Sequence, residues 1–244
     1  MKNETSKIIV TLNSDEPFNV EISGSAKSKA SVVMVHGFGV KRDSRGLFTD
    51  IEDQISDKYL SVRGDFTEVY NDYSRAIPIS SQVERLKLIV QHIQKNYPIE
   101  KIIYIGHSQG CLVVTKANPT NSQVILLAPP IIDPATRFSK TPGWTRPGSI
   151  LKIDGESRLQ RSDGSITLVG SEFWSDFNKI DAQSLYKQLN SYNDVQIIFA
   201  GSDQVLGIQK SPKDIKHDSI PLAEHDFKGE PRKELLDRLL TIIH

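Results

Sequence analysis

The sequence predicts an α/β fold in which a mostly parallel sheet of about eight strands is covered by helices on both faces. Strand-like apolar runs alternate with amphipathic segments along most of the chain, as in sheets whose parallel strands are joined by helices. The run at 31–35 is almost continuously apolar, which is typical of a central strand. A Gly-His-Ser-Gln-Gly segment at 106–110 stands between such a run and a helical segment, which indicates a strand-turn-helix unit.

Composition limits the classes of function. The 244 residues suit one large domain or a domain with an insertion, and 30 basic residues cancel 30 acidic ones. That balance argues against a nucleic-acid or membrane partner. The N-terminus has no apolar targeting segment and no run reaches membrane-spanning length, so we expect a soluble, cytoplasmic protein, with monomer and homodimer both open. Cys111 is the single cysteine, which excludes an intrachain disulfide, and we expect it to be buried.

The elements of the first half follow from periodicity. Runs 8–12 and 18–22 are strand-like and are joined by turn-forming residues, so they predict an antiparallel hairpin. The central strand at 31–35 comes next. Apolar residues then recur on one face of a helix at 47–57, and 59–63 reads as the following strand.

Residues 79–97 form the clearest predicted helix. Apolar residues recur there at spacings of three and four, and Pro98 ends the pattern. Ser81 and Glu84 have the spacing of a capping box. The strand at 101–105 and the Gly-His-Ser-Gln-Gly turn follow directly.

The second half resumes the alternation after an interruption. We expect a buried strand at 122–127, a helix at 182–189 and a strand at 195–199. A last strand at 218–222 is edge-like because proline occupies one of its positions. The final helix, 230–243, carries five apolar residues expected to face inward: Leu235, Leu236, Leu239, Leu240 and Ile243.

The interruption itself predicts an inserted cap at 131–178, between core segments 1–130 and 179–244. Asp-Gly pairs separate short alternating runs there, a pattern typical of hairpins. We therefore expect a small three-stranded meander in the cap: 150–153, 158–161 and 165–169.

The Gly-His-Ser-Gln-Gly turn points to nucleophilic chemistry at Ser108. A serine on a sharp turn between strand and helix needs very small neighbours two positions away, which glycine supplies. Its hydroxyl is then exposed to a base and a substrate, near a helix N-terminus that favours negative charge. The alternative is a close-packed Gly-Ser connection with no chemistry.

Two further residues complete a catalytic pattern. A serine hydroxyl needs a histidine base, and the histidine needs a carboxylate to orient it. Asp203 follows the strand at 195–199, and His225 follows the last strand. Carboxyl ends of parallel strands meet at one edge of a sheet, so we expect Ser108, Asp203 and His225 to meet. Read singly, Asp203 is an ordinary turn residue and His225 a solvated loop histidine.

An oxyanion hole is expected from two backbone N–H groups. One is that of Gln109, directly after the serine. The other is that of Phe38, in the His-Gly-Phe-Gly segment that follows the strand at 31–35, where Gly37 allows close approach to a substrate.

These segments together resemble the α/β-hydrolase superfamily over nearly the whole chain. His-Gly-Phe and Gly-His-Ser-Gln-Gly are similar to segments of small bacterial esterases of the cinnamoyl/feruloyl esterase and serine-aminopeptidase-like groups. The resemblance implies an eight-stranded sheet and hydrolysis of a small-molecule carboxylic ester without metal or cofactor. One departure is the stretch at 65–71, which lacks the Asp-x-x-Gly-x-Gly of many members and predicts a loop of different shape.

The cap is the expected source of substrate contacts. Trp144 and Trp174 are candidates to line an acyl pocket, the alternative being that they only pack the meander onto the sheet. Basic residues there, Arg146 among them, suit a solvated face or an anionic substrate. A peptidase, thioesterase, acyltransferase or C–C bond hydrolase uses the same triad, and a noncatalytic binding or scaffold protein is the alternative outside enzymes.

Overall fold

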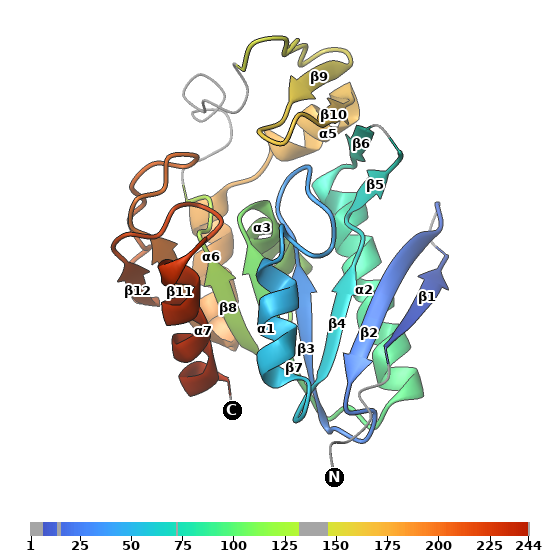
Figure 1. Ribbon diagram of the computed structural model, residues 1–244, viewed down its shortest axis with the longest axis vertical. Helices are drawn as coiled ribbons and strands as arrows, with labels where there is room; N and C mark the ends of the chain where they lie inside the picture. The colour runs from blue at the N-terminus through green and yellow to red at the C-terminus, as the bar shows by residue number, and fades with distance from the viewer. Residues whose placement is uncertain (1–6, 14–15, 72, 132–145, 244) are drawn as a thin grey trace.

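A computed structural model describes residues 7–13, 16–71, 73–131 and 146–243. Its main sheet has eight strands in the order β1-β2-β4-β3-β7-β8-β11-β12 (Figure 1). The bounds of these strands are β1 Ile8–Leu12, β2 Phe18–Gly24, β3 Ala30–Val35, β4 Leu60–Gly64, β7 Lys101–His107, β8 Gln123–Leu127, β11 Asp194–Ala200 and β12 Lys216–Ile220.

The predicted mixed character of this sheet is confirmed. β1 pairs with β2, and β2 with β4, in antiparallel register, whereas every pairing from β4 to β12 is parallel. The parallel strands therefore end at one edge, beneath the second sheet at the top of Figure 1. β12 begins two residues earlier than the sequence predicted and ends before Pro221, so the proline does not interrupt the strand.

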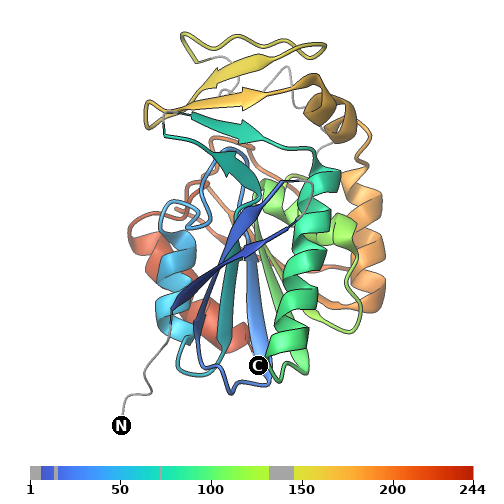
Figure 2. The ribbon, with the colours of Figure 1, turned by 90° about the vertical axis from the view of Figure 1, so that its right-hand side faces the viewer.

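Helices cover both faces of the sheet, as predicted. α1 (Leu47–Ile55) and α7 (Glu230–Ile242) pack on one face, and α2 (Ile79–Asn96), α3 (Gln109–Ala117) and α6 (Ala182–Tyr192) on the other (Figure 2). Two hydrophobic cores result, one on each side of the strands. No helix in the described ranges has the length and apolar character needed to cross a membrane.

Two details of the helices correct the sequence predictions. Leu240 of α7 is exposed to solvent, because the helix turns only a narrow stripe toward the sheet. The capping box at Ser81 is not used, since α2 begins at Ile79. Instead the Ser80 N–H donates to Asp176 Oδ2 at 2.7 Å. Asp176 belongs to α5 (Ser171–Phe177), so a distant segment caps the helix.

A second sheet lies above the carboxyl edge of the first and has the order β5-β6-β10-β9. β9 (Ser157–Gln160) and β10 (Ile166–Val169) form the predicted hairpin. The expected third strand is reduced to one bridge, between Ile150 and Arg158. The sheet is completed by β5 (Thr67–Val69), within the stretch 65–71 predicted as a loop of different shape, and by β6 (Tyr73–Ala76), for which the sequence predicted no element. β6 pairs with β10 in parallel, which joins it to the cap.

Candidate active site

Ser108 occupies a strained turn between β7 and α3. Its φ of 53° lies in the left-handed region that non-glycine residues rarely adopt. The turn needs glycine on both sides: a Cβ at Gly106 would stand 2.8 Å from the Cα of Cys111, and one at Gly110 would overlap the carbonyl oxygen of Val35. The steric reason for glycine at these two positions is therefore visible in the packing. Cys111 itself is fully buried, as predicted.

Ser108, His225 and Asp203 form a continuous hydrogen-bonded chain. His225 Nε2 lies 2.8 Å from Ser108 Oγ, and His225 Nδ1 lies 2.7 Å from Asp203 Oδ2. The three residues come from the ends of β7, β12 and β11, strands whose carboxyl ends share one edge of the sheet. A hydroxyl, an imidazole and a carboxylate thus stand within hydrogen-bond reach of one another, the arrangement expected for a nucleophile, its base and an orienting group.

The Asp203 carboxylate is held on both of its oxygens. Oδ1 accepts the N–H groups of Val205 and Leu206, each at 2.8 Å, and Oδ2 faces His225. Burial acts to raise the pKa of Asp203, but the hydrogen bond and charge of His225 and the two N–H donors outweigh it and lower the pKa below its ordinary value. Asp203 is therefore ionised at neutral pH and accepts a hydrogen bond from the Nδ1–H of His225.

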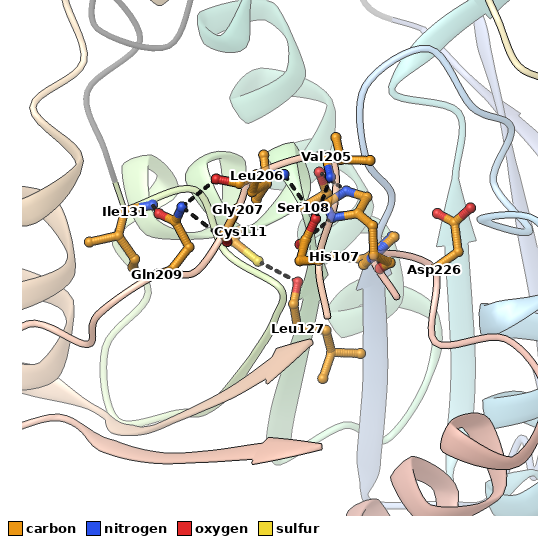
Figure 3. A network of polar contacts seen from close by, with 12 residues as sticks. His107, Ser108, Cys111, Leu127, Ile131, Val205, Leu206, Gly207, Gln209 and Asp226 are labelled. Atoms are coloured by element: carbon orange, nitrogen blue, oxygen red, sulfur yellow. Dashed lines mark hydrogen bonds and ion pairs between the residues drawn. The ribbon is translucent and has the colours of Figure 1, made fainter. Parts of the chain in front are cut away.

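The loop carrying Asp203 is tied to the start of the cap. Gln209 Nε2 donates to the carbonyl oxygen of Leu206 at 2.6 Å, and Gln209 Oε1 accepts the N–H of Ile131 at 3.1 Å (Figure 3). Ile131 is the last described residue before position 146. The hydrogen bonds that fix Asp203 therefore continue to the boundary of the predicted cap.

A buried histidine orients the expected oxyanion loop. The N–H of Phe66 donates to His36 Nε2 at 3.0 Å, so the proton of the neutral ring is on Nδ1, which donates to the carbonyl oxygen of Gly37 at 2.8 Å. Burial lowers the pKa of His36 to about 4, which keeps the ring neutral. The Gly37 carbonyl and the Phe38 N–H belong to one trans peptide and point in opposite directions. His36 thus fixes the direction of the Phe38 N–H.

The His107 side chain holds the main chain at His225 in place by a hydrogen bond. Its Nε2 donates to the carbonyl oxygen of His225 at 2.9 Å, and its Nδ1 accepts the hydroxyl of Ser44 at 2.9 Å. The ring is almost completely buried. Burial, together with the neighbouring His225, lowers the pKa of His107 to about 4.

We expect this histidine to make the protein less stable in weak acid. The folded-state pKa is about 4 and the unfolded value is 6.5, so the unfolded chain takes up the proton first as the pH falls. The contribution of the neutral His107 ring to the free energy of unfolding is fully present above pH 6.5 and is lost as the pH falls to 4. About 2 kcal/mol of this contribution is lost between pH 7 and pH 5. Urea denaturation at both values should show a smaller fall for His107→Gln than for the wild type. A His217→Gln control, altered at an exposed position, should behave like the wild type. An equal fall in the free energy of unfolding in all three proteins would contradict the assignment of this effect to His107.

The comparison with known proteins rests on structure. No protein-family model matches the chain, and no curated protein matches it. Est1E from Butyrivibrio proteoclasticus is similar with a TM-score of 0.69 and 16% identity, over 96% of this chain and 98% of Est1E. An esterase domain from Rhodothermus marinus has a TM-score of 0.68 and 16% identity, over 98% of this chain and 96% of that domain. An alpha/beta hydrolase from Novosphingobium aromaticivorans has a TM-score of 0.62 and 13% identity, over 98% of this chain and 99% of that protein. The chain has the α/β-hydrolase fold.

In this α/β-hydrolase fold, a cavity of about 550 Å³ lies over Ser108. Gly37, Phe38 and Gln109 line it, as the sequence predicted for residues beside the nucleophile. The sequence did not single out the charged side chains of its wall: Arg45, Arg161, Lys228, Glu224 and Asp226. Arg146 also lines it and was expected as a solvated or anion-binding residue.

The expected aromatic lining is placed differently. Trp174 is fully buried, donates from Nε1 to Ser157 Oγ at 3.1 Å and meets Phe173 edge to face. It does not line the cavity, so its contacts favour the alternative in which it packs the second sheet onto the core. Phe177 of the same helix does line the cavity. Trp144 lies outside the described residues.

Acidic, histidine and cysteine side chains do not gather into a group of three that would suit a metal ion anywhere in the described ranges. A second cavity, of about 610 Å³, adjoins the β1–β2 hairpin. It contains none of the groups around Ser108, and its buried Arg63 is ion-paired with Glu21 and Glu52.

Proposed function

We propose that the protein is a serine hydrolase that cleaves small-molecule carboxylic esters through an acyl-enzyme. The observation that carries the proposal is the chain of hydrogen bonds from Ser108 Oγ through His225 to Asp203, at 2.8 and 2.7 Å, opening on a cavity. Nucleophile, general base and orienting carboxylate are the three groups that acyl transfer by serine needs.

The first half of the reaction forms the acyl-enzyme. Ser108 Oγ attacks the ester carbonyl carbon while its proton passes to His225 Nε2, and Asp203 stabilises the imidazolium. The carbonyl oxygen becomes negative and is bound by the N–H groups of Phe38 and Gln109. The tetrahedral intermediate then breaks its bond to the alcohol oxygen, which takes the proton from His225 and leaves.

The second half restores the enzyme. Water enters the place of the alcohol, gives its proton to His225 Nε2 and attacks the acyl carbon. The new intermediate collapses with its bond to Ser108 Oγ breaking, and the serine regains its proton. The products are a carboxylic acid and an alcohol.

The comparisons support the ester as substrate class without defining the ester. The similar structure from Rhodothermus marinus is described as an esterase domain, and one structure of Est1E has ferulic acid bound. A shared fold does not fix a substrate. The cavity of about 550 Å³ accommodates an ester of small or medium size.

Two assays test the proposal together. A fluorophosphonate probe should label the folded protein, with the added mass located on Ser108 by peptide mass spectrometry. A series of 4-nitrophenyl esters from acetate to long chains, with a hydroxycinnamate ester beside it, should show turnover and define the acyl preference. Folded protein that is neither labelled nor active on any of these esters would favour a noncatalytic binding role.

His36→Ala is expected to lower kcat about 100-fold, with a much smaller change in KM. The Phe38 N–H acts only on the developing oxyanion, and loss of one such donor costs on the order of 10²–10³ in kcat. Steady-state kinetics on 4-nitrophenyl butyrate measures both constants. His36→Asn keeps a donor near the Gly37 carbonyl and should recover part of the loss. A His36→Ala variant that raises KM and leaves kcat intact would exclude this positioning role.

A further inference from the structure

The wall of the cavity over Ser108 carries more positive than negative charge. Four basic and two acidic side chains line it. Arg45 Nη1 donates to Asp226 Oδ2 at 2.9 Å, which pairs one cation with one anion. Glu224, Lys228 and Arg146 are exposed to solvent, which screens their charges. Arg161 is different from these, because it is half-buried and has no ion pair with any carboxylate of the described chain.

Arg161 lies directly against the expected oxyanion loop. It follows β9, and its Nη2 donates to the carbonyl oxygen of Phe38 at 2.9 Å. Its guanidinium also stands over the Phe38 ring, with Cζ 5.3 Å from the ring centroid. A Cβ at Gly39 would stand 2.6 Å from Thr167 Oγ1 and 3.3 Å from Arg161 Cζ, so glycine at this position leaves room for both side chains. The cation is therefore held beside the place where an ester binds.

The guanidinium retains hydrogen-bonding capacity that the described chain does not use. Nε of Arg161 is buried without a hydrogen-bond partner, and so is Nε of Arg45. A buried donor without a partner is costly to leave unsatisfied. Nε of Arg63, elsewhere in the molecule, also has no hydrogen-bond partner, but the Glu52 carboxylate lies 3.0 Å from it as an ion pair. Arg45 has an anion as well, in Asp226, whereas Arg161 has none among the described residues.

The electrostatics of the cavity agree with this geometry. Burial, with the neighbouring Arg45, lowers the pKa of Arg161 to about 10. The side chain is still a cation at neutral pH, but it is a cation in an environment that disfavours positive charge. The negative charge of an anion bound beside Arg161 would offset both the cost of burying the cation and its repulsion from Arg45.

We propose that the substrate is an ester with a carboxylate on one of its two halves, bound by Arg161 with the help of Arg45. This rests on the proposed esterase function and specifies its substrate class. One unpaired guanidinium balances one negative charge, and a carboxylate carries one at neutral pH. The guanidinium fork also matches the two oxygens of a carboxylate. The excess of basic over acidic residues in the cavity wall would attract such a substrate from solution.

A purely structural role for Arg161 makes a different prediction. If its function is only to hold the Phe38 carbonyl, its removal disturbs the oxyanion loop and slows charged and neutral esters equally. If it binds the substrate, its removal changes the ratio between them. The ratio of kcat/KM for matched esters, measured in one variant, therefore separates the two roles.

Two pairs of esters locate the charge. On the acyl side, mono-4-nitrophenyl adipate is compared with its N-methylamide, which has the same shape without the charge. On the alcohol side, 4-(carboxymethyl)phenyl hexanoate is compared with its N-methylamide. We expect the wild type to prefer the carboxylate in one pair by at least about tenfold, the effect of one charge-assisted hydrogen bond. Higher salt should reduce the preference in part.

Three variants complete the experiment. Arg161→Gln should reduce that preference about tenfold or more, and Arg161→Lys should restore only part of it, because lysine has the charge without the fork. Arg158→Gln is the matched control: it removes the same charge from β9, the strand that directly precedes Arg161, at an exposed position outside the cavity, and should keep the preference. Circular dichroism verifies that each variant is folded.

The outcomes distinguish this inference from the proposed function. Turnover of the neutral esters that depends on Ser108, without preference for either carboxylate, would leave an esterase and overturn the anionic substrate. A preference that survives Arg161→Gln would overturn the role of Arg161. Absence of all turnover would overturn the esterase itself. In that case titration of unreacted mono-4-nitrophenyl adipate into Ser108→Ala and its Arg161→Gln double variant still tests binding, with weaker binding in the double variant expected.

Discussion

Ser108→Ala is expected to lower kcat/KM for 4-nitrophenyl butyrate by about 10⁴- to 10⁶-fold, the loss typical of serine hydrolases without their nucleophile. The substitution removes the one oxygen that lies 2.8 Å from His225 Nε2, so no acyl-enzyme can form. The cavity and the oxyanion donors stay in place. Residual hydrolysis would come from them alone, and fluorophosphonate labelling should disappear together with the activity.

A second serine in the same cavity provides the control. Ser162 lines the cavity but makes no hydrogen bond with His225 among the described residues. Ser162→Ala should therefore keep activity within a few-fold of the wild type. Ser108→Ala replaces a residue of φ 53° by one with similar backbone preferences, so thermal unfolding of both variants should resemble that of the wild type. A Ser108→Ala protein with undiminished turnover would refute the nucleophile.

The residues around Ser108 were predictable because their reasons are local. A sharp turn between strand and helix leaves room only for glycine at positions 106 and 110, and this constraint is visible in five consecutive residues. Asp203 and His225 were predictable because each follows a strand, and parallel strands end at one edge of the sheet. Their proximity to Ser108 follows from the topology of the sheet, and the structure supplies the distances between their atoms.

The second sheet was only partly predictable, because one of its three strand pairings is not local. β9 and β10 are joined by a short turn with an Asp-Gly pair, which a sequence displays. β6 pairs with β10 although more than 80 residues separate them, and nothing within β6 indicates this partner. The position of Arg161 depends on that sheet, so its contact with Phe38 could not be inferred from the chain alone.

The same distinction applies to capping and to the tryptophan. Ser81 and Glu84 have the spacing of a capping box, but Asp176 satisfies the N-terminus of α2 from a helix almost 100 residues away. Trp174 is aromatic and lies in the cap, which made it a candidate for the pocket. Its indole N–H finds Ser157 in the interior instead. Composition shows that an aromatic is present, whereas packing decides which way it faces.

Asp203→Asn is expected to cost about 10⁴-fold in kcat, although it changes the shape of the site hardly at all. Oδ1 of Asp203 accepts two backbone N–H groups, so the asparagine oxygen is held there by Val205 and Leu206. The amide NH₂ must then face His225 Nδ1. A donor at that position forces the histidine proton onto Nε2, and a protonated Nε2 cannot accept the proton of Ser108.

Asp226→Asn is the informative comparison, because Asp226 directly follows His225 in the chain and its carboxylate lines the cavity. It is paired with Arg45 and makes no hydrogen bond with the His225 ring in the described structure. If the tautomer of His225 limits the rate, Asp203→Asn must cost far more than Asp226→Asn, and kcat on 4-nitrophenyl butyrate measures both. Comparable losses would mean that the negative charge near His225, and not the hydrogen bond to Nδ1, is what matters. The two backbone donors on Oδ1 are the reason to expect the first result, since they leave the amide only one orientation.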